Sequence, residues 1–189
     1  MLSLTCFGDK WVMAGVCRGV RGEVLRDPLK ILEDLKALGE DFSAQIFDAE
    51  PIISLRQIHA AAVAAYLSFK AGVNISKRLE IEFLLRLAAD TQIDRALEKI
   101  GVKPNSREVG FCIFADNREK VIEVGKAALR ILGGEALTDT ELGAEDRIGS
   151  ALKFYEIDEL ELENVQAGSR LQAALLLILE RIATLDIKR

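Results

Sequence analysis

The sequence predicts an α+β fold, with a central, mostly antiparallel sheet flanked by several helices. Strand-like segments occur as an N-terminal hairpin and two short apolar runs, whereas helical periodicity fills most of the remaining chain. No repeat or linker divides these parts, and 189 residues suffice for one hydrophobic core. We therefore predict a single compact domain over residues 1–189.

The predicted sheet consists of the hairpin and two further strands. Apolar, aromatic and β-branched residues on both sides of a Gly-Asp pair at 8–9 are typical of a hairpin. The hairpin and the loop 18–26 that follows it together occupy residues 1–26. The short apolar segment 44–49 predicts a buried strand. The continuous apolar run 109–115 predicts a central strand, because a strand covered on both faces lacks polar alternation.

Capping residues and glycines mark the predicted helices. Asp27-Pro28 begins a helix that ends at Gly39, and Ser54 with Gln57 has the spacing of a capping box at the start of a second helix, which ends at Gly72. The other helices are predicted to begin near Ser76, at Thr91 with Asp94, at Asp116 and at Arg147, and the last covers 169–187. The polar segments 135–146 and 158–164 are expected to be loops.

The composition argues against several classes of protein. A net charge of −5 disfavours a protein that coats nucleic acid, although a small local RNA site remains open. Cys6, Cys17 and Cys112 lack C-x-x-C spacing, so we expect neither disulfides nor a metal site. We find no membrane-spanning run and no secretion signal, and expect a cytoplasmic protein without a membrane partner.

The sequence offers no evident catalytic constellation or cofactor motif. His59 is the only histidine and has no serine or cysteine nucleophile at a suggestive spacing, which favours a packed neutral ring over a general base. The acidic run 156–163 favours a solvated turn over paired carboxylates. The glycine-containing segment 17–22 favours a hairpin exit over a phosphate loop. We therefore predict a protein that is not an enzyme, with an acid–base enzyme using His59 as the alternative.

Three segments in combination resemble a known family. They are "QIFDAEPIISLRQIHAAAVAA" (45–65), "NISKRLEIEFLLRLAADTQIDRALEKIGV" (74–102) and "EVGFCIFA" (108–115). Together they are similar to the small regulatory subunit of the KEOPS complex, the family of the protein that binds the PRPK-type atypical kinase. The C-terminal "LILERIATLDI" resembles the end of archaeal members.

The resemblance implies a non-catalytic subunit with two partners. Such a subunit docks on the small lobe of the kinase-like ATPase subunit, meets other KEOPS subunits indirectly, and captures the single-stranded CCA end of tRNA. It thereby supports threonylcarbamoyl modification of the adenosine next to the anticodon. A homo-oligomeric scaffold without RNA binding remains the alternative.

The predicted RNA site is centred on the start of the helix near Ser76. Asn74 and Ser76 are expected to cap a helix whose first turn carries Lys77 and Arg78, so that free N–H groups and two cations face a phosphate, with Ile75 exposed as a platform for a base. Relatives often have a basic residue where Thr91 stands, and Arg95 could replace it. The predicted RNA-binding residues are Asn74, Ile75, Ser76, Lys77, Arg78, Gln92 and Arg95.

The predicted kinase site lies on the last helix. Alternating steps of four and three join Leu171, Leu175, Ile178, Ile182 and Leu185 into a seam that the protein's own sheet could bury. Leu176 and Leu179 flank the seam. Periodicity alone leaves a fully internal helix equally open, whereas the resemblance favours Leu175, Leu176, Leu179 and Ile182 as partner-binding residues.

Overall fold

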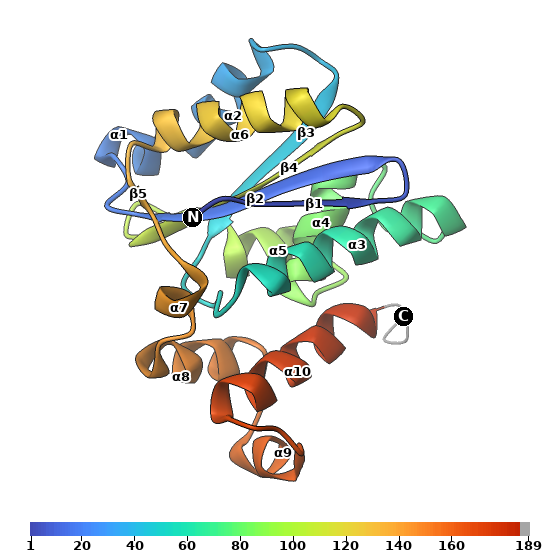
Figure 1. Ribbon diagram of the computed structural model, residues 1–189, viewed down its shortest axis with the longest axis vertical. Coiled ribbons are helices and arrows are strands. Elements are labelled where there is room, and N and C mark those ends of the chain that lie inside the picture. The colour runs from blue at the N-terminus through green and yellow to red at the C-terminus, as the bar shows by residue number, and fades with distance from the viewer. Residues whose placement is uncertain (186–189) are drawn as a thin grey trace.

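A five-stranded antiparallel sheet forms the centre of the protein, which we describe over residues 1–185 of a computed structural model (Figure 1). The strand order is β1-β2-β4-β3, and β5 pairs with the end of β2. The strands are β1 (Ser3–Phe7), β2 (Lys10–Arg18), β3 (Phe42–Asp48), β4 (Glu108–Ala115) and β5 (Glu135–Ala136). The predicted α+β class with an antiparallel sheet is confirmed.

The apolar run 109–115 forms the central strand β4, as predicted. It lies between β2 and β3, and every residue from Val109 to Ala115 is buried. Gly110 allows close packing there, because a Cβ atom at this position would lie 2.1 Å from the ring of Phe47. The hairpin of β1 and β2 is also confirmed, and Gly8 turns it with a φ of 60°.

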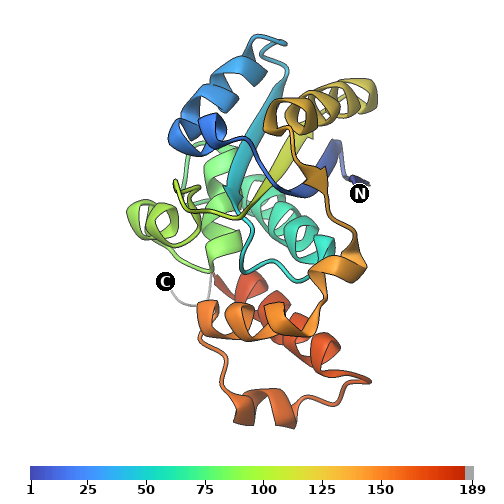
Figure 2. The same ribbon diagram turned by 90° about the vertical axis from the view of Figure 1, so that its left-hand side faces the viewer.

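Helices cover both faces of the sheet in layers (Figures 1 and 2). One face carries α1 (Gly22–Arg26), α2 (Pro28–Lys36) and α6 (Arg118–Leu132). The other carries α3 (Leu55–Ala71), α4 (Leu79–Ala88) and α5 (Ile93–Ile100). An outer layer of α7 (Asp139–Leu142), α8 (Glu145–Phe154), α9 (Glu159–Asn164) and α10 (Arg170–Ala183) lies beyond α3. In residues 1–185, no helix is apolar over a bilayer-spanning length.

Several predicted helix ends are confirmed. Asp27, Ser54 and Ser169 are N-caps whose side chains accept backbone hydrogen bonds, and Gly72 and Gly133 end their helices with positive φ. The last helix ends at Ala183 with Thr184 at its C-cap, earlier than predicted, and the predicted end at Ile187 lies outside the described residues.

Other helix starts differ from the prediction. The helix expected near Ser76 begins at Leu79, the next one has Gln92 rather than Thr91 at its N-cap, and that after β4 is capped by Asn117 rather than Asp116.

The capping box expected from Ser54 and Gln57 does not form. Ser54 accepts from the Arg56 amide, whereas Gln57 is fully buried. The Gln57 side-chain amide donates to the carbonyl of Pro51 and to the hydroxyl of Tyr155, which in turn donates to the carbonyl of Leu87. Burial raises the pKa of Tyr155, so its hydroxyl remains a donor at neutral pH. These bonds tie the outer layer to α3 and α4.

Three segments expected to be loops contain regular structure. α1 lies within 18–26, β5 and α7 lie within 135–146, and α9 occupies most of 158–164. Thr138 and Glu141 form a reciprocal capping box, and Asp158 accepts from the amide of Glu161. The short helices persist because each buries an apolar side chain, namely Val24, Leu142 and Leu162.

Candidate functional site

The loop between α3 and α4 is tied to a buried carboxylate. Glu82, in the first turn of α4, is fully buried, and its Oε2 accepts hydrogen bonds from the amides of Ile75 at 2.8 Å and Ser76 at 2.9 Å. The Ser76 hydroxyl accepts from the amide of Arg78. The side chain of Asn74 donates to the carbonyl of Ser76. The loop therefore satisfies its own polar groups from inside the protein.

This arrangement corrects the predicted phosphate site. Free N–H groups were expected where the helix begins, but the amides of Ile75 and Ser76 bond to an internal carboxylate, and Ser76 is buried. Ile75 is half-buried against the core rather than fully exposed. Lys77 and Arg78 are exposed, and the Arg78 Nε donates to Glu80 at 2.7 Å. Any phosphate contact at this loop would therefore come from side chains.

Gln92 and Arg95 lie at the start of α5, beyond the C-terminal end of α4. Both are exposed, and both contact Asp90, which accepts from the Gln92 amide and pairs with Arg95 and Lys99. Burial alone would raise the pKa of Asp90, yet these groups together hold that pKa below its usual value. Ten residues of α4, about 15 Å of helix, separate this group from the 74–78 loop. The predicted RNA residues thus form two groups.

The predicted seam on α10 is buried inside the protein. Exposed fractions are 8% for Leu175, 0% for Ile178 and 1% for Ile182. The seam packs on α3, α8 and α9 rather than on the sheet, because α3 and α4 already cover that face of the sheet. Leu175 and Ile182 are therefore inaccessible to a partner, which corrects their assignment to the kinase site.

Leu176 and Leu179 differ in accessibility. Leu176 is 45% exposed, whereas Leu179 is half-buried against the core. Ala183 follows Leu176 by seven residues, close to two turns, so both lie on one face of α10. Ala183 also lines an apolar hollow with α3 residues and Val73.

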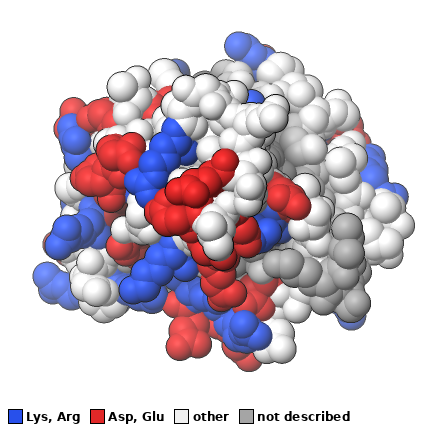
Figure 3. All heavy atoms as spheres, turned by 90° about the horizontal axis from the view of Figure 1, so that it is seen from below, with Lys and Arg blue, Asp and Glu red and all other residues white. Residues whose placement is uncertain are grey.

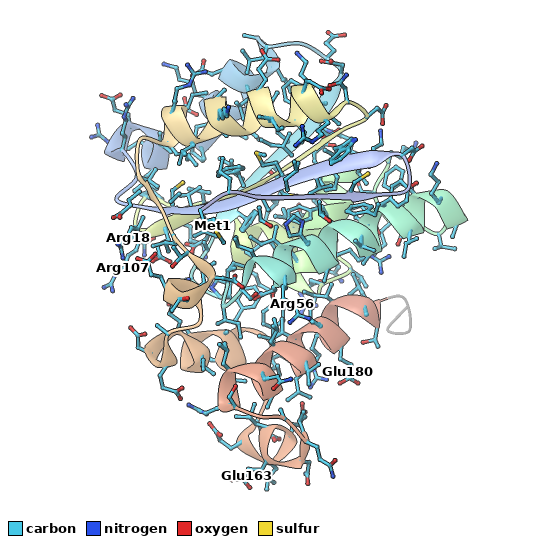
Figure 4. All side chains as sticks on the ribbon, in the orientation of Figure 1. Met1, Arg18, Arg56, Arg107, Glu163 and Glu180 are labelled. Carbon is cyan, nitrogen blue, oxygen red and sulfur yellow. The ribbon has the colours of Figure 1, made fainter. Side chains whose placement is uncertain are left out.

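We call the apolar side chains beside this hollow and on the adjoining face of α10 the α3–α10 patch. It consists of Leu67, Val73, Leu176, Leu179 and Ala183, of which Leu67 and Val73 are 56% and 45% exposed. Figure 3 views the outer layer from below, where uncharged side chains dominate the right-hand part and charges of both signs crowd the left. In Figure 4, Arg56 lies at the start of α3, away from Leu67, and Glu180 lies on α10, between Leu176 and Ala183 in the chain. The patch has the composition expected of a protein–protein contact.

The structure also brings together a serine and a histidine that the sequence did not connect. The His59 Nε2 lies 2.8 Å from the Ser3 hydroxyl, across from α3 to the edge strand β1. Burial lowers the pKa of His59, and its Nδ1 is buried without a hydrogen-bond partner in the described chain. The third group that would orient the ring is thus absent among residues 1–185. The pair is best explained as a contact that fastens β1 to α3.

The described part of the chain also contains no group of three His, Cys, Asp or Glu side chains suited to a metal ion.

Comparison with protein families identifies a matching family. The model of the family described as kinase binding protein CGI-121 covers residues 25–186. The chain belongs to the CGI-121 family of kinase-binding proteins. This agrees with the resemblance to the small KEOPS subunit, and it gives the exposed apolar patch a functional context. A search of curated proteins finds no match.

Proposed function

We propose that this CGI-121 protein is a non-catalytic subunit that binds the small lobe of a kinase-like ATPase through its α3–α10 patch. The observation that carries this proposal is Leu176, which lies exposed in an otherwise well-packed helix of a kinase-binding family member. An exposed leucine on a helix that also lines an apolar hollow, here through Ala183, is typical of an interface. Leu179, which is half-buried at the edge of the core, contributes its exposed part to the same patch.

Substitution of Leu176 by glutamate is expected to weaken kinase association by about 2 kcal/mol or more, roughly 30-fold, because the interface would bury an unpaired charge. Titration calorimetry with the kinase-like subunit of the same organism measures this change. Leu160→Glu on α9, where the side chain is 71% exposed outside the patch, is the matched control and should bind normally.

Three other outcomes would contradict this assignment. Early melting of Leu176→Glu would mean that the side chain packs in the core, and normal binding with normal melting would place the interface elsewhere. The third outcome is a wild-type protein that forms a dimer and binds neither the kinase nor tRNA. If Leu176→Glu also makes that dimer monomeric, the homo-oligomeric scaffold is favoured.

We further propose that the protein captures the single-stranded CCA end of tRNA and so supports threonylcarbamoyl-adenosine formation next to the anticodon, in the cytoplasm. The resemblance to KEOPS small subunits supports this role. The 74–78 loop presents two exposed cations beside a half-buried isoleucine, a combination suited to a few nucleotides. The acidic net charge is compatible with such a small site.

Ile75→Glu, or Lys77→Ala with Arg78→Ala, is expected to weaken binding of intact tRNA by about tenfold, through loss of base contact or of phosphate contacts. The double alanine variant should also have a salt dependence shallower by about 0.7 per lost phosphate contact. Filter binding at several salt concentrations measures both quantities.

The matched control for charge is Lys126→Ala with Arg130→Ala, two exposed residues of α6 on the opposite face of the sheet. If the loop variants and removal of the CCA end all leave affinity unchanged, RNA capture at this loop is wrong.

A further inference from the structure

The two oxygens of Glu82 have separate partners. Oε2 accepts the amides of Ile75 and Ser76, as described above, while Oε1 accepts from Arg86 Nε at 3.1 Å and Nη2 at 3.0 Å. Arg86 is 1% exposed, and its Nη2 also donates to the Ser68 hydroxyl at 2.6 Å. A single buried carboxylate therefore connects the loop to the interior of α3 and α4.

Stability alone does not explain this arrangement. Buried ion pairs can often be replaced by apolar side chains of similar size without loss of stability, since removing two charges from water is costly. What an apolar pair cannot do is accept two backbone hydrogen bonds. The loop residues 73–78 form no helix or strand, so the bonds to Glu82 fix the backbone where the loop meets the core.

We propose that Glu82 is a positioning residue for RNA capture, which holds the 74–78 loop in one conformation so that Ile75, Lys77 and Arg78 are presented together. Arg86 neutralises Glu82 and orients its carboxylate from the side of α3. The inference rests on the proposed RNA function. A loop fixed before binding loses less conformational freedom when RNA binds, so affinity depends on a residue that never touches RNA.

The double variant Glu82→Met with Arg86→Met tests this role, because it removes both charges and keeps the side-chain volume nearly constant. We expect it to fold, and a cooperative melting transition of the free protein checks this. Its affinity for tRNA should fall by about tenfold, as a loosened loop must be ordered on binding. Hydrogen exchange at the amides of Ile75 and Ser76 should accelerate at least tenfold, while β4 remains protected.

Ser68→Ala is the matched control within the same cluster. It removes the hydroxyl that accepts from Arg86 but leaves Glu82 bonded to the loop, so loop exchange and tRNA affinity should stay unchanged. If the double variant fails to fold, Glu82→Asp is the second test of the positioning role. Its charge still balances Arg86, but the side chain is one methylene too short to reach both Arg86 and the loop amides.

The outcomes separate this inference from the proposed function. Normal tRNA affinity of a folded Glu82 variant, with Ile75→Glu still defective, would overturn the positioning role and leave RNA capture standing. If Ile75→Glu, the Lys77, Arg78 variant and removal of the CCA end are all harmless, RNA capture at this loop is wrong, and so is a positioning role that serves it. Unchanged amide exchange in every Glu82 variant would show that the carboxylate does not hold the loop.

Discussion

Replacement of Arg86 by methionine alone is expected to lower the free energy of unfolding by about 3–5 kcal/mol, since it leaves the carboxylate of Glu82 buried with its counter-charge removed. Both side chains are at most 1% exposed, so water cannot solvate the remaining charge without opening the structure. Urea unfolding followed by circular dichroism measures the loss.

The control for Arg86→Met is the double variant in which Glu82 is also methionine. It should recover part of the lost stability, because the carboxylate of Glu82 is no longer buried without the charge of Arg86 beside it, although the amides of Ile75 and Ser76 lose their acceptor. Equal stability of the single and double variants would show that the carboxylate itself costs nothing, and would contradict the explanation by an unpaired charge.

Replacement of Ile178 by alanine is expected to cost about 2–5 kcal/mol of stability, because it opens a cavity between α10 and the rest of the core. Ile178 is fully buried in the seam that joins the outer layer to α3. Differential scanning calorimetry of the free protein should record a lower melting temperature.

Leu176→Ala, two residues away on the exposed flank of α10, is the matched control and should change stability by less than about 0.5 kcal/mol. Similar losses for the two variants would mean that the helix buries both flanks equally. That result would remove the basis for a docking surface on α10.

The sequence predicted those elements whose local signals agree with their tertiary surroundings. The apolar run 109–115 required burial on both faces, and β4 provides it. The alternating spacing in the last helix separated the buried Ile178 from the exposed Leu176. Asp27-Pro28 and Ser54 marked helix starts because capping is a local interaction.

Elements were missed where weak local signals depend on distant partners. The acidic segment 158–164 was expected to be a solvated turn, yet Leu162 is buried in the core and fixes α9. The D-x-x-E spacing at Asp158 was the available signal of a helix start. Gln57 was assigned to a local cap, whereas its actual partner Tyr155 lies 98 positions away.

The candidate site was predictable only in part for the same reason. An acid in the first turn of a helix is ordinarily a solvated partner of the helix dipole, so the sequence did not mark Glu82 as buried. Only the fold brings Arg86 and the loop amides to its two oxygens. The contact between Ser3 and His59 likewise joins two elements whose sequence separation conceals it.

The position of α3 between the sheet and α10 gives its alanines a geometric consequence. Ala61, Ala62 and Ala65 are fully buried, and Ala60 and Ala64 line the hollow beside Ala183. Small side chains let neighbouring elements approach closely, so the volume of alanine determines how far α10 stands from the sheet. Where Ala60, Ala64 and Ala183 meet, their small side chains leave the hollow between α3 and α10 open. The contour offered to a partner is thus set by the residues with the smallest side chains.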